Sequence, residues 1–228
     1  PFDPRLLPVI ATAVAKAAMN SGVSSRPIKN LYAYRKNLEG SIHKTSILMR
    51  PAFEAAKSSS RRIIFAEGED ERVLRASFDL IEETNDVPIL LGRPDVVKRR
   101  IEKYGLPLKP GKNFELVNPE SDPRYREYWE TYHSIMQRRG VTPSLARAIM
   151  RTNTTAIAAV MVKRQEADSL ICGSYGQYLW HLKYIDEILS EKNLKPLGAI
   201  SMMILESGPL FVGDTQIHPQ PSSEQIAK

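Results

Sequence analysis

Short apolar runs alternate with amphipathic stretches in the middle of the chain. The apolar runs occupy residues 62–66, 87–91 and 114–117, and a loop rich in glycine, proline or acidic residues follows each of them. Between these runs, residues 71–83 and 95–104 carry apolar side chains at helical spacing. Strands that alternate with helices predict a parallel sheet with crossover helices, so the fold class is expected to be α/β.

Helical patterns dominate the following part of the chain. Aromatic and apolar side chains recur at spacings of three and four, at Tyr125, Trp129, Tyr132 and Met136. Gly140 is expected to end this helix, and Thr142-Pro143 to begin a second one that runs to about Lys163. The remaining predicted elements are a strand at 169–172, a helix at 177–189, and a hairpin of strands 199–205 and 209–213 with its turn at 206–208.

The two ends of the chain suggest neighbouring sequence. Residues 5–20 predict a helix that stops at Gly22, and residues 23–50 are polar and basic. At the other end, Ser222–Ile226 has the pattern of a helix start. The chain is therefore expected to be a piece of a longer polypeptide. The expected parts are residues 1–28 as the end of a preceding domain, 29–60 as a linker, and 61–228 as a main domain that is incomplete at its C-terminus.

Composition is that of an ordinary globular protein, with 42% hydrophobic and 25% charged residues. The formal net charge is +6, which favours anionic partners, but the basic residues form only short clusters such as Lys98–Arg100. A nucleic-acid-binding protein would show a denser basic stripe, so no nucleic-acid partner is expected. Apolar stretches such as 156–162 fall far short of the ~18 residues of a membrane span, so no membrane partner is expected.

Cysteine and histidine usage narrows the chemistry further. Cys172 is the single cysteine, which excludes an intramolecular disulfide and favours a cytoplasmic location. It is expected to be a buried structural thiol. The four histidines are scattered without metal-ligand spacing, so no metal site is expected. Asp214 and His218 follow a predicted strand, where catalytic groups often lie; the alternative is a turn aspartate beside a surface histidine.

Three loops at predicted strand ends form the candidate ligand site: 67–70, 92–94 and 173–176. In parallel α/β sheets, ligands bind beyond the carboxyl ends of the strands, and helix N-termini favour anions. Two simpler interpretations compete with this one: Glu69 and Asp70 cap a helix, and residues 173–176 form a tight turn. No dinucleotide or P-loop glycine motif is present.

Several segments in combination resemble the phosphate acetyl/butyryltransferase family. They read RIIFAEGEDERVL at Arg62–Leu74, ADSLICG at Ala167–Gly173 and GPLFVGD at Gly208–Asp214, and this resemblance covers residues 50–228. Residues 1–28 are similar to the last helix and exit of the NADP-binding domain of malic enzymes. The whole chain therefore resembles the C-terminal region of bacterial hybrid malic enzymes, in which a phosphotransacetylase-like domain follows the malic enzyme.

The chain departs from the transferase motifs at positions that bind phosphate in the family. Met136 stands where the resemblance implies a substrate-binding arginine, Lys183 replaces a second arginine, and Cys172 replaces a serine. A guanidinium binds phosphate with paired hydrogen bonds, whereas methionine offers no donor and lysine no fork. Acyl transfer to phosphate is therefore expected to be impaired, although a CoA thioester could still bind.

The resemblance implies a fold of two α/β subdomains with a cleft, like isocitrate dehydrogenase, present here in part. It implies a regulatory and oligomerising domain of an enzyme that converts malate to pyruvate and CO2. NADP and a divalent metal (Mg or Mn) would bind in the preceding part, with acetyl-CoA as effector and a homo-oligomer as assembly. The cleft residues implied are Gly173, Ser174, Lys183 and Asp214. The alternatives are an active phosphate acetyl/butyryltransferase and a purely structural assembly domain.

Overall fold

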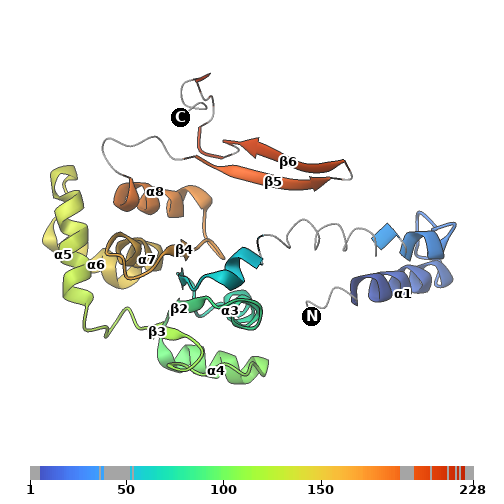
Figure 1. Cartoon of the computed structure of the whole chain (residues 1–228), viewed down its shortest axis with the longest axis horizontal. Coiled ribbons are helices and arrows are strands. Elements are labelled where there is room, and N and C mark those ends of the chain that lie inside the picture. The colour runs from blue at the N-terminus through green and yellow to red at the C-terminus, as the bar shows by residue number, and fades with distance from the viewer. Residues whose placement is uncertain are drawn as a thin grey trace. The chain divides into compact units, whose positions relative to one another are not determined.

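The computed structural model divides the chain into two compact units, Pro1–Glu54 and Ala55–Lys228, which are described separately (Figure 1). The described residues are 6–35, 37–38, 52, 54–190, 198–205, 207–214, 216–218, 220 and 222–223. The predicted helix start at Ser222–Ile226 therefore lies largely outside them, as does part of the hairpin turn at 206–208. The boundary between the units falls inside the predicted linker, whose limits remain a prediction.

The first unit contains helix α1 (Leu6–Asn20), as the sequence predicts. Its stop is Gly22, which adopts a left-handed φ of 75° and donates its N–H to the carbonyl of Met19. Glycine is favoured at this kind of helix end because it has no Cβ to clash in the left-handed conformation. Most of the large apolar side chains of α1 are exposed within this unit: Leu6, Leu7, Val9, Ile10 and Val14.

A four-stranded parallel sheet organises the second unit, which confirms the predicted α/β class. Its strands are β1 (Arg62–Phe65), β2 (Val87–Leu91), β3 (Glu115–Val117) and β4 (Ser169–Ile171), in the order β3-β2-β1-β4. The register aligns Phe65 of β1 with Leu90 of β2 and with Ile171 of β4. The strands are parallel, so their carboxyl ends and the loops that follow them meet at one edge of the sheet.

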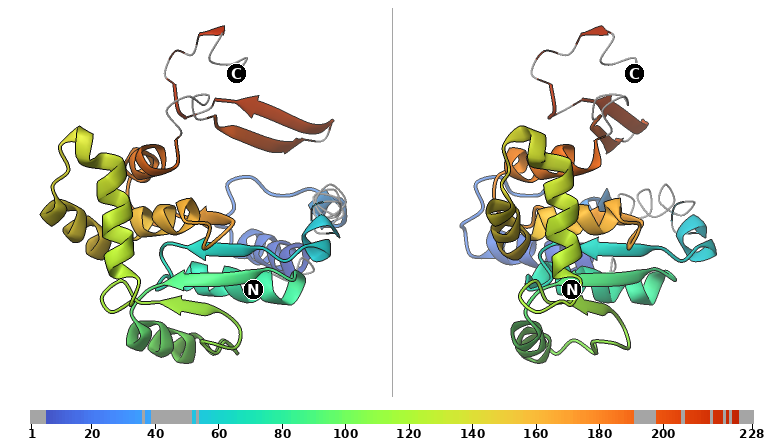
Figure 2. Two further views of the ribbon diagram at one scale, coloured as in Figure 1. Left: turned by 60° about the vertical axis from the view of Figure 1, so that its left-hand side comes forward. Right: turned by 90° about the vertical axis from the view of Figure 1, so that its left-hand side faces the viewer.

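Helices cover both faces of this sheet (Figure 2). Helices α3 (Glu71–Glu83) and α4 (Pro94–Tyr104) cover one face. There, Phe65 and Leu90 of the sheet pack with Leu74 and Val97 of the helices in one buried cluster. The other face packs under α5 (Tyr125–Met136), α6 (Pro143–Thr152), α7 (Thr154–Lys163) and α8 (Tyr178–Leu189). A 3-10 turn at Gln137–Arg139 follows α5 and ends at Gly140. Alternate strand residues thus face alternate layers.

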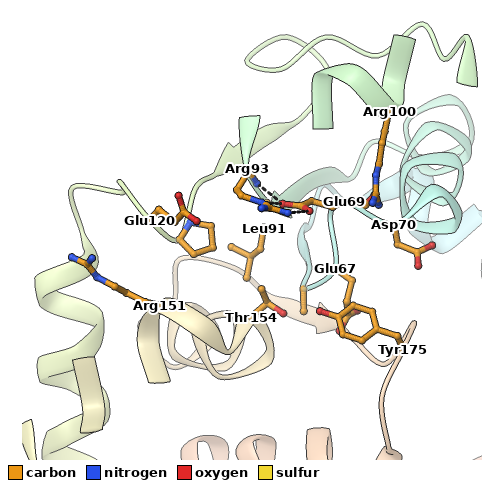
Figure 3. A pocket seen from close by; sticks show the side chains of 13 residues that line it. Glu67, Glu69, Asp70, Leu91, Arg93, Arg100, Glu120, Arg151, Thr154 and Tyr175 are labelled. Atoms are coloured by element: carbon orange, nitrogen blue, oxygen red, sulfur yellow. Dashed lines mark hydrogen bonds and ion pairs between the residues drawn. The ribbon is translucent and has the colours of Figure 1, made fainter. Parts of the chain in front are cut away.

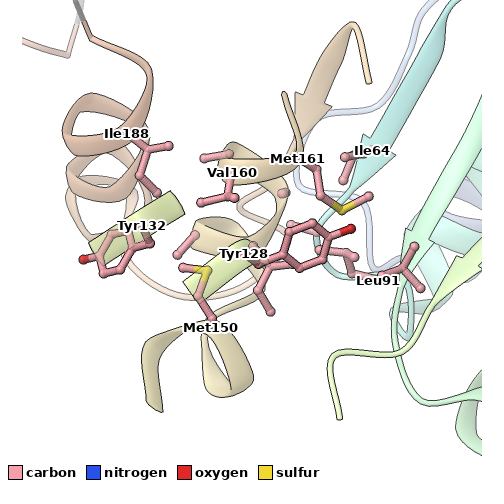
Figure 4. Close-up of a cluster of buried hydrophobic side chains, with 14 of the residues drawn as sticks. Ile64, Leu91, Tyr128, Tyr132, Met150, Val160, Met161 and Ile188 are labelled. Atoms are coloured by element: carbon pink, nitrogen blue, oxygen red, sulfur yellow. The ribbon is translucent and has the colours of Figure 1, made fainter. Parts of the chain in front are cut away.

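Helix α7 lies in the middle of the second layer and is buried on all sides from Thr155 to Met161 (Figure 4). The sequence prediction of one helix from Thr142 to Lys163 is wrong. Helix α6 ends at Asn153. The Asn153 side chain accepts a hydrogen bond from the N–H of Ala156, 2.8 Å away, and so caps the start of α7. Such a cap begins a new helix direction without leaving its first donors unsatisfied.

The last elements are strands β5 (Ile200–Leu205) and β6 (Gly208–Gly213), which pair antiparallel as a two-stranded ribbon. Met202 pairs with Phe211 and Met203 with Leu210, and all four side chains are at least 43% exposed. The predicted hairpin is confirmed for the described residues. Among the helices that the structure describes, none combines the length and apolarity that a membrane span requires.

Candidate functional site

A pocket of about 460 Å³ lies at the carboxyl ends of the parallel strands (Figure 3). Loops 67–70 and 92–94 both contribute to its wall, and Tyr175 from loop 173–176 completes it. The three loops singled out in the sequence therefore converge on one site. The lining residues are Ala66, Glu67, Glu69, Asp70, Leu91, Gly92, Arg93, Arg100, Pro119, Glu120, Arg151, Thr154 and Tyr175.

Asp70 performs the helix-capping role that the sequence offered as the simpler interpretation. Its side chain accepts a hydrogen bond from the N–H of Arg72 at 2.8 Å and pairs with the Arg72 guanidinium through both oxygens. The hydrogen bonds from the Arg72 side chain are the main reason that the pKa of Asp70 lies below its usual value. Arg72 also donates to the carbonyl of Ser174, which ties the loop at 173–176 to the start of α3.

Glu69 pairs with arginine in the same way. It accepts two hydrogen bonds from the Arg93 guanidinium, at 2.8 and 2.9 Å, and one from the Arg93 N–H at 2.9 Å. These hydrogen bonds outweigh the cost of burial and lower the pKa of Glu69. Arg100 donates to the backbone carbonyl of Glu69, and its positive charge also contributes to the lowered pKa of the Glu69 carboxyl.

One wall of the pocket offers groups that favour an anion. Thr154 is the first residue of α7, where backbone N–H groups and the helix dipole attract negative charge. Arg151 stands at the end of α6, with its guanidinium 4.5 Å from the centre of the Tyr125 ring. In the described part of the chain, Arg151 forms no ion pair with a carboxylate.

A buried polar network lies below the loop at 173–176. His181 is 4% exposed and its Nε2 lies 2.7 Å from the carbonyl oxygen of Tyr175. A carbonyl only accepts, so Nε2 carries the proton. The Nδ1 atom lies 2.7 Å from Thr155 Oγ1 and 3.9 Å from Oε1 of Glu67. Glu67, itself 5% exposed, accepts the N–H of Gly173 at 3.2 Å from each oxygen. His181 and Glu67 thus hold both ends of the loop.

Glycine is required at Gly176, where the loop turns into α8. Its φ is 91°, and a Cβ atom there would lie 3.0 Å from Nε2 of His181. The left-handed conformation and the close approach to the imidazole both disfavour a side chain. The loop is therefore shaped by tertiary contacts with His181 as well as by its own turn.

Cys172 follows β4 and is half-buried beside this network. Burial is the main cause that raises the pKa of its thiol to about 11, and the Glu67 carboxylate adds to the effect, while a hydrogen bond with Thr155 opposes it. The raised pKa supports the prediction of a structural thiol, because the thiolate is the nucleophilic form, but the residue is half-buried and not buried as predicted.

Cys172 is accordingly expected to react slowly with iodoacetamide. With a pKa near 11 instead of 9.0, the thiolate population at pH 8 falls about 100-fold, and the alkylation rate should fall with it. The rate is measured between pH 7 and 11 by mass spectrometry, with free cysteine as the control. A rate that levels off below pH 9 would contradict this expectation.

A second depression of about 510 Å³ is lined in part by residues of the same loop. Its lining is mainly apolar and includes Gly173, Tyr178 and Leu182 beside the edge strand β4. The loop at 173–176 therefore contributes to both depressions, with Tyr175 in the polar pocket and Gly173 and Gly176 in the apolar one.

The four residues predicted for the cleft are not brought together. Gly173 lines the apolar depression, and Ser174 contacts Arg72 next to the polar pocket. Lys183 lines neither: its side chain is 63% exposed, with Nζ 4.0 Å from Glu187. Asp214 follows β6 and lies outside both linings, with its carboxylate 2.6 Å from Nδ1 of His218. Hydrogen bonds from His218 outweigh desolvation and lower the pKa of Asp214.

Met136 is 4% exposed in the core cluster and does not line the polar pocket. Arg100, Arg151 and the network around His181 were not predicted from the sequence as parts of the site. Arg100 belongs to the basic cluster at 98–100, which was a visible signal, whereas nothing local marks Arg151. Among the described residues, no group of three or more histidine, cysteine, aspartate or glutamate side chains could hold a metal ion.

Comparison with known proteins decides the family. The sequence matches the phosphate acetyl/butaryl transferase family over residues 47–228. The chain belongs to this family. Within it, the whole chain is 48% identical to a stretch of the NAD-dependent malic enzyme of Rhizobium meliloti and 44% identical to one of the NADP-dependent malic enzyme of Escherichia coli. These stretches lie in the C-terminal region and make up 30% of each relative's length. A phosphate acetyltransferase of Synechocystis is 27% identical over 88% of the chain.

Solved phosphotransacetylases share the fold of this transferase-family chain. The EutD phosphotransacetylase of Staphylococcus aureus superposes with a TM-score of 0.68 at 24% identity, covering 80% of this chain and 54% of that protein. A phosphotransacetylase of Streptococcus pyogenes gives a TM-score of 0.69 at 23% identity. The chain thus spans about half of the solved structures and 30% of the malic enzymes.

Proposed function

We propose that this transferase-family chain is the regulatory and oligomerising region of a malic enzyme and that it binds acetyl-CoA in the polar pocket. The observation that carries the proposal is the convergence of three strand-end loops on a pocket with arginines and a helix N-terminus. Acetyl-CoA carries phosphate groups that such a site would favour. We further propose that the malate reaction, with NADP and a divalent metal, takes place in sequence that this chain does not span.

Self-assembly is the second part of the proposal. The exposed apolar side chains of the β5–β6 ribbon support it, since a two-stranded ribbon is marginal alone and large apolar patches are usually covered. Ile200 and Phe211 are 77% and 63% exposed. An active acyltransferase is the weaker candidate, because Met136 and Lys183 supply no guanidinium and lie away from the polar pocket.

The test follows malate-dependent formation of reduced nucleotide by the full-length natural protein with Mg²⁺ or Mn²⁺. Both NAD and NADP are used, since the relatives include enzymes dependent on each. Acetyl-CoA should lower the rate, and Arg151→Gln should raise the acetyl-CoA concentration for half inhibition about tenfold by removing a charge-assisted contact. Activity that ignores acetyl-CoA would overturn the effector proposal.

Two further variants make the result specific. Arg147→Gln is the matched control, because Arg147 also lies on α6 and stacks on an aromatic ring, that of Trp129 at 4.4 Å, but does not line the pocket. Lys183→Ala tests the position implied by the transferase motif. Weaker inhibition with Lys183→Ala and not with Arg151→Gln would place the effector outside the polar pocket. Turnover of acetyl phosphate and CoA would favour the acyltransferase instead.

A further inference from the structure

One side of α4 forms a cationic surface next to the polar pocket. Val96, Arg99, Arg100, Lys103 and Tyr104 line a depression of about 430 Å³. Their spacing of three, four, seven and eight residues places them on a single helical stripe. Every charged member of the stripe is positive, while the acidic residues of α4 lie outside the lining.

Arg99 and Lys103 have no carboxylate partner in the described part of the chain, whereas the charge of Arg100 acts on Glu69. Within the described ranges, neither Arg99 nor Lys103 forms an ion pair, and Arg100 donates to a backbone carbonyl. Lys103 Nζ lies 5.5 Å from the centre of the Tyr104 ring, which leaves its three donors available. Two cations without carboxylate partners, next to Arg100, favour a multiply charged anion.

Arg100 connects this surface with the polar pocket, because it lines both depressions. Figure 3 shows its side chain reaching from α4 toward Glu69 and Asp70. A ligand in the polar pocket that extends past Arg100 would therefore meet Arg99 and Lys103. Acetyl-CoA is extended and carries a phosphomonoester, the 3′-phosphate of its adenosine, apart from its diphosphate.

We infer that Arg99, Arg100 and Lys103 bind the 3′-phosphate of an acyl-CoA whose remaining groups occupy the polar pocket. The inference rests on the proposed function and adds a source of specificity. It distinguishes CoA esters from dephospho-CoA esters, which share the acyl group, the pantetheine arm and the diphosphate.

Isothermal titration calorimetry of the full-length natural protein tests the inference with acetyl-CoA and acetyl-dephospho-CoA. The wild type should bind acetyl-CoA at least tenfold more tightly, since a phosphate dianion makes charge-assisted hydrogen bonds. In the Arg99→Gln/Lys103→Gln double variant, the affinities for the two esters should differ by no more than about threefold. Lys98→Gln is the matched control, because Lys98 lies on α4 outside the depression and should leave the ratio unchanged.

The outcomes separate the two proposals. Absence of acetyl-CoA binding would overturn the proposed function together with the inference. Equal binding of both esters by the wild type, or a preference that survives in the double variant, would overturn the inference alone. Adenosine 3′,5′-bisphosphate should compete with acetyl-CoA, whereas competition by inorganic phosphate at the same concentration would show a general anion site and reject the 3′-phosphate assignment. The Arg99→Gln/Lys103→Gln and Lys98→Gln variants should both retain the wild-type melting temperature.

Discussion

The Gly68→Ala variant is expected to lose about 3 kcal/mol of its free energy of unfolding. An added Cβ atom would lie 2.8 Å from the Cβ of Leu90 and 2.8 Å from the carbonyl oxygen of Leu91. That carbonyl already accepts the N–H of Gly68 at 2.9 Å, so the loop has no room to retreat without losing this hydrogen bond. Overpacking against backbone costs more than against a flexible side chain, because the strand cannot rotate away.

Urea unfolding followed by circular dichroism measures the effect. Gly198→Ala is the matched control, because a Cβ there meets no atom of the described residues within 4 Å and the backbone is not left-handed. Its free energy of unfolding should change by less than about 0.5 kcal/mol. Equal urea midpoints for the two variants would contradict this prediction. They would mean that the loop at 67–70 can shift to accommodate a Cβ atom despite its close packing against β2.

Strands β1, β2 and β3 were predictable from the sequence because helices cover both faces of the sheet, so most of their side chains are apolar. Mainly apolar runs bounded by turn residues marked 62–66, 87–91 and 114–117, and the observed strands differ from these ranges by at most one residue. The break at Asn153 was not predicted, although Arg151–Thr155 is a run of five polar residues and asparagine often caps the start of a helix.

The site was predictable only in part. Residues that follow strands share one edge by topology, so the loops could be placed together before any coordinates were known. Arg151 and His181 lie inside helices. The spacing of residues in a helix predicts which face a side chain occupies, but not which other element that face contacts. Lys183 illustrates the converse: motif position suggested a cleft residue, whereas its side chain pairs with Glu187 at the surface.

The His181→Ala variant is expected to cost about 3 kcal/mol of stability. His181 bonds the Tyr175 carbonyl and the Thr155 hydroxyl, each at 2.7 Å, and it lies next to the buried Glu67 carboxylate. Truncation of His181 leaves the Tyr175 carbonyl, the Thr155 hydroxyl and the Glu67 carboxylate each without one buried partner. A buried polar group that loses its partner destabilises the folded state, because water does not replace the lost interaction. Urea unfolding measures the loss, with His133→Ala as control, because the His133 side chain makes no hydrogen bond among the described residues.

The His181→Ala variant should also increase the motion of the loop at 173–176. Such an increase distinguishes the loss of an anchoring contact from the effect of a cavity alone. Amide hydrogen exchange of the peptide containing Tyr175 should accelerate at least tenfold under conditions in which the core strands stay protected. A double-mutant cycle with Glu67→Gln should give a coupling free energy of about 1 kcal/mol or more, because both side chains hold the same loop. Additive losses with unchanged exchange at Tyr175 would contradict the anchoring role. In that case the two residues stabilise the core independently, and the pocket wall owes its shape to Arg72 and Gly176 instead.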